Sequence, residues 1–228
     1  MCSSDLLSQY VELLEEHEAK ISRGEAVSKP PYLHDVPIFS LLPDLVKDIE
    51  PFPTELFPEW YADKWYNYIQ FFMGGTGSLT PLHFDTLYTH NLFFQVVGSK
   101  KFYLISPEKK GNCYIEGWRW AKFDPNNPDY EKFPEAKSAT ISEVIVEAGD
   151  ILFMPSGTLH QVHGLSYSIS FNIDWHTPKT ATKGVLSLFE GAPTENVFYN
   201  SIVLLGLGLK IPSKYLFPYY KPYLNYVS

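Results

Sequence analysis

Hydrophobic residues recur at helical spacing near the start of the chain. The apolar positions are Leu6, Leu7, Tyr10, Leu13 and Leu14. They follow Ser4, a residue type that favours a helix N-cap, and they precede Gly24, a residue type that ends helices. The pattern predicts an amphipathic helix to about Ser22. A second short helix is predicted over residues 39–49, before Pro51 and Pro53.

From Trp65 onward the pattern changes to short apolar and aromatic runs separated by turn residues. Strands are predicted over residues 65–73, 91–97, 101–105, 143–147, 150–154 and 166–175, with another strand at His160. Gly98-Ser99 joins two of these runs and predicts a hairpin. After Pro178 the spacing is helical again, over Val197 to Leu209 and an aromatic tail from Tyr215 to Tyr226.

Short strands with frequent turns are typical of a sandwich or a barrel. We therefore expect a mainly β protein with flanking N- and C-terminal helices. The chain of 228 residues is long enough for one domain with a sizeable core. The expected division is a helical part over about 1–60, a β core over about 61–177, and C-terminal helices over about 178–228.

Composition narrows the function classes. A formal net charge of −8 argues against a nucleic-acid surface, which needs clustered Lys and Arg. Cys2 and Cys113 are the two cysteines, and Cys2 lies at the terminus, so we expect no structural disulfide and a reducing compartment, the cytoplasm. The N-terminal residues lack the basic and apolar regions of a secretory signal, and no segment predicts a membrane span.

Three side chains of metal-ligand type stand at the edges of predicted strands. His83 and Asp85 are two positions apart, so in a strand both project from one face, and His160 follows the apolar run 151–154. Two imidazoles and one carboxylate can occupy one face of an octahedral Fe(II) and leave the other face open for a co-substrate and O₂. The bland alternative for a single His-x-Asp is a surface pair.

Several segments, in shared order, resemble the JmjC or cupin-like hydroxylases, and among them the asparaginyl hydroxylase of hypoxia-inducible factor. They include Tyr32-Leu33-His34, the run Leu79 to Asp85, the run Asn91 to Lys100, residues 123–134, the run Ala148 to Pro155, and Ser170 to Trp175. The resemblance covers about residues 6–175. It implies a double-stranded β-helix, which is a jelly-roll or cupin-like barrel.

The resemblance also implies roles for the matched positions. Fe(II) is expected on His83, Asp85 and His160. The distal carboxylate of the co-substrate 2-oxoglutarate is expected to pair with Lys100 and to accept hydrogen bonds from Thr80 and Tyr32. Asn91 and Asn172 are expected to line the same pocket near the metal, and a wall of Phe72, Phe93 and Trp175 is expected to exclude water. A buried dicarboxylate needs a cation and fixed donors, because its desolvation is otherwise prohibitive.

Each of these assignments has an alternative. Lys101 is the second candidate for the carboxylate anchor, and Tyr32 can be simple core packing. His163 is the rival of His160, whereas His90 and His176 are read, like His163, as structural or as neighbours of the metal ligands.

The implied activity is hydroxylation of a protein or peptide side chain, or of a small molecule, with O₂ as oxidant and release of succinate and CO₂. An N-methyl-lysine demethylase and a non-catalytic cupin-like binding protein are the alternatives. The C-terminal apolar residues exceed what a small β core covers. A homodimer through these helices is therefore expected, with packing against the chain's own barrel as the alternative.

Overall fold

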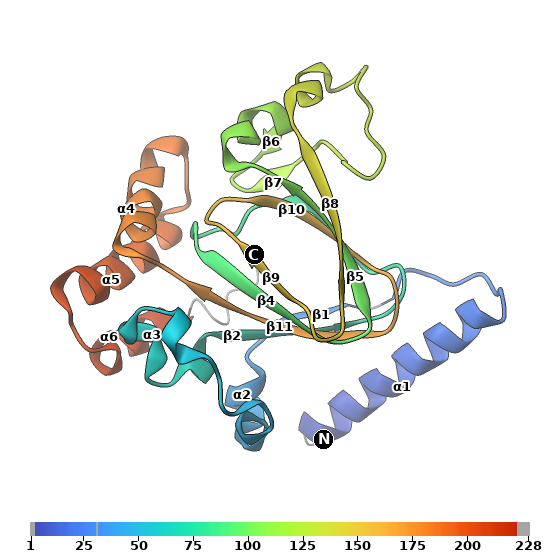
Figure 1. The fold of residues 1–228 in the computed structure, drawn as a ribbon, viewed down its shortest axis with the longest axis horizontal. Helices are drawn as coiled ribbons and strands as arrows, with labels where there is room; N and C mark the ends of the chain where they lie inside the picture. The colour runs from blue at the N-terminus through green and yellow to red at the C-terminus, as the bar shows by residue number, and fades with distance from the viewer. Residues whose placement is uncertain (1–2, 31, 223–228) are drawn as a thin grey trace.

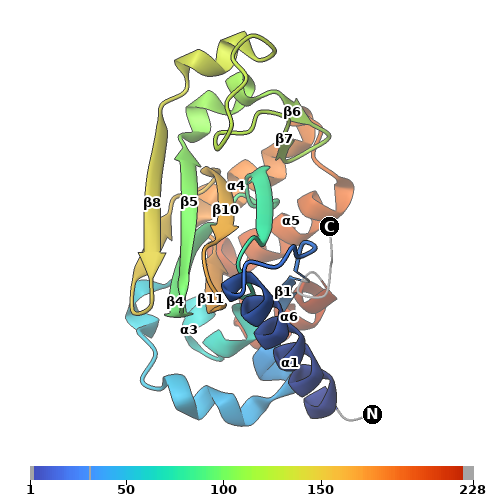
Figure 2. The same cartoon turned by 90° about the vertical axis from the view of Figure 1, so that its right-hand side faces the viewer.

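The computed structural model describes residues 3–30 and 32–222 as two β-sheets flanked by helices (Figures 1 and 2). The helices before the barrel are α1 (Ser3–Ser22), α2 (Ile38–Leu41) and α3 (Glu59–Ala62), with 3₁₀ turns at Pro43–Ile49, Thr54–Leu56 and Trp65–Tyr68. The helices after it are α4 (Pro178–Leu186), α5 (Thr194–Leu209) and α6 (Ser213–Tyr220), with a 3₁₀ turn at Ser187–Glu190. The helical segments therefore lie where the sequence predicts them, although the tail beyond residue 222 falls outside the described residues.

One sheet has five strands and the other has six, and all pairs are antiparallel. The five-stranded sheet runs β1 (Leu33–Val36), β2 (Ile69–Gly74), β11 (Ser168–Trp175), β4 (His90–Val97) and β9 (Ile151–Met154). The six-stranded sheet runs β6 (Ile115–Glu116), β7 (Trp120–Ala121), β3 (Leu79–His83), β10 (Leu159–Gly164), β5 (Ser99–Ile105) and β8 (Ile141–Glu147). This arrangement confirms the expected jelly-roll fold with flanking helices.

The predicted hairpin at Gly98-Ser99 is wrong. β4 pairs with β11 and β9, whereas β5 pairs with β10 and β8 in the opposite sheet. Gly98 has a φ of +72°, and a Cβ there would lie 2.0 Å from the carbonyl oxygen of Tyr167. The glycine therefore serves a tight crossing between the two sheets, because only a residue without a side chain fits so close to another backbone.

Two predicted elements differ from the observed ones. Residues 65–68 form a 3₁₀ turn before β2 instead of the first half of a strand. The expected helix over residues 39–49 is divided at Leu42, since Pro43 has no N–H to continue the helical ladder and starts a 3₁₀ turn.

Apolar side chains gather in three clusters. The largest lies where the helices cover the outer face of the five-stranded sheet, and it includes Trp60, Tyr61, Ile173 and Val203. A second cluster, with Phe84, Phe123 and Leu159, lies beneath the segment 107–139, which projects beyond the six-stranded sheet (Figure 2). The third fills the interior between the sheets and includes Phe93, Phe102 and Met154. Phe93 and Met154 of this interior cluster also line a cavity between the sheets.

Helix α1 fixes the edge strand β1 next to the barrel (Figure 1). The hydroxyl of Tyr10 donates to the carbonyl of Met73 in β2, 2.9 Å away, and accepts from the N–H of Leu33 in β1, 3.0 Å away. Glu18 accepts from the backbone N–H and the hydroxyl of Thr76 at the turn after β2. Side-chain hydrogen bonds therefore attach the first helix to β1, to β2 and to the turn after β2.

The C-terminal helices cover the barrel and also expose an apolar stripe. Ile202 and Val203 are buried in the chain's own core, and Leu204, Leu207, Leu216 and Phe217 pack against it. Phe198, Leu205 and Leu209 are 53%, 46% and 68% exposed, and their spacing puts them on one face of α5. Intrachain packing thus accounts for much of the apolar surface, and this stripe is the remaining basis for a dimer. Among the described residues, no helix is long and apolar enough to span a membrane.

We expect a homodimer in solution, because a stripe of this kind on a helix favours pairing with a second copy. Light scattering at micromolar concentration should give twice the chain mass of 26.1 kDa. Leu205→Glu should return the protein to the monomer, whereas Leu6→Glu, at an exposed position of α1, should not. A monomer mass that stays constant on concentration would contradict the dimer.

Candidate metal and co-substrate site

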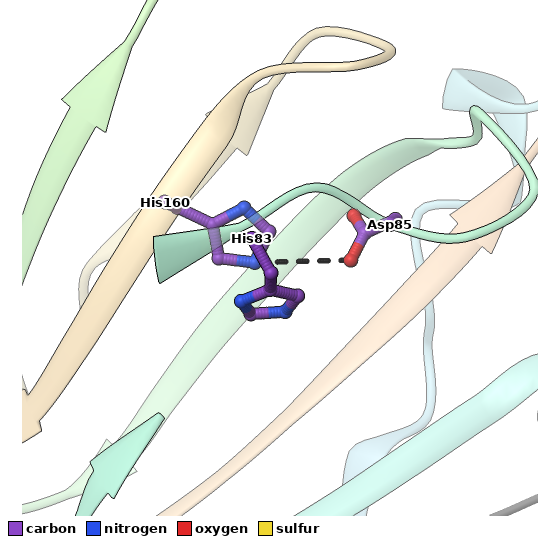
Figure 3. Close-up of side chains that lie close together, drawn as sticks. All are labelled: His83, Asp85 and His160. Atoms are coloured by element: carbon purple, nitrogen blue, oxygen red, sulfur yellow. Dashed lines mark ion pairs between the residues drawn. The ribbon is translucent and has the colours of Figure 1, made fainter. Parts of the chain in front are cut away.

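Three side chains of metal-ligand type lie close together and line one cavity (Figure 3). His83 in β3 and His160 in β10 stand directly opposite each other on paired strands, and their ring centroids are 4.3 Å apart. Asp85 lies two residues beyond His83, in the turn after β3 instead of within the strand, and its Oδ1 is 3.7 Å from Nε2 of His160. One donor atom from each residue lies within 4.8 Å of the others.

The two histidines are oriented by the same local hydrogen bond. Nδ1 of His83 donates to the carbonyl of Pro81 at 2.8 Å, and Nδ1 of His160 donates to the carbonyl of Thr158 at 3.1 Å. A carbonyl oxygen only accepts, so each Nδ1 carries the proton and each Nε2 keeps its lone pair. A fixed tautomer with Nε2 free is the arrangement that a metal-binding imidazole requires.

Burial shapes the electrostatics of this cluster. It lowers the pKa of His83 well below its usual value, and the nearby charges of His160 and Arg119 lower it further. Burial also raises the pKa of Asp85, which His160 and Arg119 partly offset. A neutral imidazole is ready to bind a cation, and a buried carboxylate whose own charge is poorly solvated gains strongly from one.

The donor set fits Fe(II). Two imidazole nitrogens and one carboxylate oxygen, all lining one cavity, match the two-histidine, one-carboxylate arrangement that non-haem iron proteins use. The cavity has a volume of about 270 Å³ and extends from these residues toward β2 and β4. It leaves room for further ligands beside a metal ion.

Lys100 is buried behind three aromatic rings that line the cavity. Its Nζ is 5.2 Å, 5.5 Å and 5.3 Å from the ring centroids of Tyr32, Phe72 and Phe93. It donates to the hydroxyl of Tyr32 at 3.2 Å and to that of Ser170 at 2.9 Å. No carboxylate among the described residues forms an ion pair with it, and burial lowers its pKa from 10.5 to about 7.

The hydroxyl groups of Tyr32 and Thr80 add hydrogen-bond donors near the Lys100 ammonium. Burial is the main cause that raises the pKa of Tyr32, which keeps its hydroxyl protonated, and the side chain of Thr80 hydrogen-bonds with it. Lys101, the alternative anchor, points out of the barrel and pairs with Glu143 at 3.1 Å. The expected trio of Lys100, Thr80 and Tyr32 is thus brought together, and Ser170 is an additional member.

Asn91 and Asn172 line the cavity near the metal-ligand cluster, as expected. Behind them lies Asp174, whose Oδ1 accepts from Nδ2 of Asn91 at 2.8 Å and from Nδ2 of Asn172 at 3.4 Å. The Asn91 carboxamide also hydrogen-bonds to Asp85 and so lowers the pKa of that carboxyl group. Burial, followed by the charges of Asp85 and Asp35, raises the pKa of Asp174 well above its usual range.

The expected placement of Trp175 in the cavity wall is wrong. Residues of β11 alternate between its two faces, so Ser170, Asn172 and Asp174 point inward while Trp175 points outward. Its ring packs against Phe57 under the helices, with centroids 5.0 Å apart. Phe72 and Phe93 do line the cavity.

The other histidines lie away from the cluster. His163 is on the outer face of β10, where its Nε2 is 2.9 Å from Nε2 of Gln161. Nδ1 of His90 accepts from the N–H of Ser156, and the buried His176 contacts Thr180. These positions agree with structural roles.

Four further residues line the rim or wall without having been expected there: His34, Asp35, Arg119 and Trp120. Trp120 stacks on His83 with ring centroids 4.8 Å apart, and Arg119 lies over Trp120. Asp35 has a φ of +55° at an irregularity in the pairing of β1 with β2. These residues come from short edge elements, which carry no regular pattern in the sequence. For Ser170 and Asp174 a signal exists, namely polar residues at alternate positions of an otherwise apolar strand.

Comparison with known families agrees with this geometry. Residues 5–181 match the model of the family described as the cupin-like domain, and this match covers most of the chain. The chain belongs to the cupin-like domain family. The matched range contains every cavity-lining residue named above.

Curated relatives include several JmjC proteins. The chain is 37% identical to arginine-specific demethylase JMJ20 of Arabidopsis thaliana over 46% of its own length and 23% of the relative's. It is 32% identical to tRNA wybutosine-synthesizing protein 5 of Homo sapiens (56% and 42%), and 30% identical to 2-oxoglutarate and iron-dependent oxygenase JMJD4 of Gallus gallus (63% and 35%). The cupin-like chain therefore spans less than half the length of these relatives. They support the JmjC class and do not single out the asparaginyl hydroxylase.

The buried ammonium of Lys100 should destabilise the fold at neutral pH. A lysine whose folded pKa is about 7 releases its proton on folding, so stability rises as pH increases from about 7 to about 10. Lys100→Met should therefore raise the unfolding free energy by about 1–3 kcal/mol at pH 7, and the gain should shrink toward pH 10. Urea unfolding at both pH values measures it, with Lys101→Met as the matched exposed control. A Lys100→Met protein less stable than wild type at pH 7 would contradict this reading.

Proposed function

We propose that this cupin-like protein is an Fe(II)- and 2-oxoglutarate-dependent oxygenase that hydroxylates a protein or peptide side chain or a small molecule. One observation carries the proposal. The cavity is lined by the cluster of His83, Asp85 and His160 and by Tyr32, whose hydroxyl accepts a hydrogen bond from Lys100. The buried ammonium of Lys100 has no carboxylate partner among the described residues.

The two ends of the cavity suit the two ends of the co-substrate. A dicarboxylate with a keto group can bind a metal through its keto acid end while its distal carboxylate reaches Lys100, Tyr32 and Thr80. An ammonium group surrounded by hydroxyls and apolar rings gains a charge-assisted hydrogen bond from that carboxylate, and the carboxylate avoids burial without a partner.

With Fe(II), 2-oxoglutarate and O₂ bound, the site would supply oxidation of a substrate C–H bond coupled to release of succinate and CO₂. The chain's own contribution is binding and orientation. His83, Asp85 and His160 would hold the metal, the carbonyls of Pro81 and Thr158 fix the imidazole tautomers, and the rings of Phe72, Phe93 and Trp120 would exclude water from the site.

Demethylation at nitrogen is the second candidate. It is favoured by the likeness to a protein named as an arginine-specific demethylase, and it uses the same oxidation, applied to an N-methyl carbon. Formaldehyde release would identify it, whereas stable gain of one oxygen atom by the substrate identifies hydroxylation. A non-catalytic binding protein would give neither product. The expectation of no nucleic-acid substrate and of a cytoplasmic location stays a prediction.

Anaerobic titration with Fe(II) and 2-oxoglutarate tests the proposed function. A working site should give a weak visible charge-transfer band that saturates at one iron per chain. With O₂ admitted, succinate should form, and its yield across peptide and metabolite libraries should identify the substrate. Absence of both the band and succinate would defeat the proposal.

Replacement of the metal ligand should separate His160 from its neighbour. His160→Ala should abolish iron binding, because it removes one of three donors of the cluster, whereas His163→Ala should leave iron binding intact, because that ring faces outward. Calorimetric iron titration under nitrogen measures both variants. Iron binding that persists in His160→Ala and disappears in His163→Ala would reverse the assignment.

Replacement of the anchor should weaken co-substrate binding alone. Loss of a buried charge-assisted partner costs about 2–5 kcal/mol, so Lys100→Ala should reduce 2-oxoglutarate affinity by more than tenfold. Lys101→Ala is the adjacent control and should have little effect, since Lys101 pairs with Glu143 outside the barrel. The opposite ranking would move the anchor to Lys101.

A further inference from the structure

Asp85 differs from the other two members of the metal-ligand cluster in how its backbone is held. His83 and His160 stand opposite each other on paired strands, so the sheet itself holds their backbone. Asp85 lies beyond the end of β3, in the turn of residues 85–89 that leads to β4 (Figure 3). A metal ligand must be held within about 0.5 Å of its place. Contacts outside the strand pairing must therefore position this carboxylate.

The next residue, Thr86, is held by helix α5. Nδ2 of Asn196 donates to Oγ1 of Thr86 at 2.8 Å and to its carbonyl oxygen at 3.4 Å. The same carbonyl also accepts from Nε1 of Trp118 at 3.0 Å. Asn196 is 2% exposed and Thr86 is 8% exposed, so the loss of either partner would leave a buried polar group unsatisfied, which is costly. The contact therefore fixes the backbone directly after Asp85.

The rest of the turn reaches the same group of helices. Leu87 is buried and belongs to the apolar cluster that Val203 of α5 also joins. The hydroxyl of Tyr88 donates at 3.0 Å to Glu190, which ends the 3₁₀ turn after α4. The N–H of Tyr88 donates back to the carbonyl of Asp85 at 2.9 Å. Three consecutive residues after Asp85 are thus attached to the helices that follow the barrel.

Tyr88 adopts a backbone conformation that needs such support. Its φ is +61°, in the left-handed region that bulky side chains rarely adopt. A conformation of this kind persists only where its surroundings impose it. Oγ of Ser156 donates to the carbonyl of Tyr88 at 2.5 Å, and Nζ of Lys110 donates to its hydroxyl at 2.7 Å. The shape of the turn therefore depends on the elements around it and not on its own sequence alone.

We infer that Asn196 is a positioning residue for Asp85, on which it acts through Thr86. Asn196 does not line the cavity, and it lies beyond residue 181, where the match to the cupin-like domain family ends. Without its carboxamide, the two histidines keep their places on the paired strands while the carboxylate is displaced. The inference rests on one part of the proposed function, namely metal binding by the cluster that contains Asp85.

Metal affinity tests the inference without co-substrate or turnover. The full chain is titrated with Co(II), an ion that accepts the same nitrogen and oxygen donors as Fe(II), by calorimetry under nitrogen. Asn196→Ala should weaken Co(II) binding about tenfold, the lower end of the effect of removing a group that supports a metal ligand. Asn200→Ala is the matched control and should leave Co(II) affinity unchanged. It removes another buried carboxamide from the same helix, and that carboxamide donates to the carbonyl of Asn196 within the helix.

Substitutions at Thr86 test the same contact from its other side. Thr86→Val keeps the shape of the side chain and removes Oγ1, so it should weaken Co(II) binding about as much as Asn196→Ala. The double variant should be little weaker than either single variant, because all three lack the same contact. Thr86→Ser keeps the hydroxyl and should retain most of the wild-type affinity.

The visible spectrum of bound Co(II) separates positioning from general stability. At saturating Co(II), a protein that is only less stable should give the wild-type spectrum, because its folded molecules contain an intact site. Saturated Asn196→Ala should instead differ from wild type in the direction of Asp85→Ala, in which the carboxylate is absent.

Three results would overturn the inference: equal Co(II) affinity in wild type and Asn196→Ala, equal losses in Asn196→Ala and Asn200→Ala, or a wild-type spectrum in saturated Asn196→Ala. If Asn196→Ala does not fold, the comparison of Thr86→Val with Thr86→Ser decides, and equal affinities would be the contrary result. The proposed function fails on a different measurement. Wild-type protein that binds Co(II), but neither binds 2-oxoglutarate nor forms succinate, would defeat the oxygenase and leave the role of Asn196 standing. Wild-type protein that binds no metal would defeat both.

Discussion

The antiparallel pairing of β3 with β10 is the constraint on which the site depends. It joins two segments far apart in the chain and sets His83 directly opposite His160. A shift of one residue in this register would turn one imidazole to the outer face, because side chains alternate along a strand. The carbonyl of Pro81 in β3 and the carbonyl of Thr158, just before β10, then fix both tautomers. The geometry of the metal-ligand cluster is therefore set by strand register before it is set by individual side chains.

The sequence predicted the elements whose patterns are local. Alternation and turn residues located most strands. Residue type, placement at strand edges and the family resemblance selected His83, Asp85 and His160, whose donor atoms the fold brings within 4.8 Å of one another. Long-range features were harder. Gly98 is followed by a serine, which is typical of a hairpin turn, but at this position the chain crosses from one sheet to the other. Trp175 was assigned to the wrong face of its strand. Successive side chains point to opposite faces, so neighbouring residues face the cavity and the helices in turn.

Residues on short edge elements could not be predicted at all. Trp120 begins the two-residue strand β7, and Arg119 directly precedes it. Asp35 lies at an irregular position of β1. Periodicity carries no information over such lengths. These residues line the cavity, so this part of the cavity is the part that the sequence pattern describes least. The comparisons agree with this difference between core and rim. The chain belongs to the cupin-like domain family, but it spans only a limited share of each relative. The core of the site follows from the family, and the specificity does not.

The contact of Tyr10 with both β1 and β2 has a consequence for how the site is assembled. One hydroxyl in α1 bridges the edge strand β1, which carries Asp35, and its neighbour β2. Helix α1 contributes no group to the cavity, yet it determines where Asp35 and the neighbouring Tyr32 stand. Substitutions on its inner face would therefore act at a distance, as changes in ligand selectivity without any change in the residues that touch ligand. Mutational surveys confined to the cavity lining would miss this layer of control.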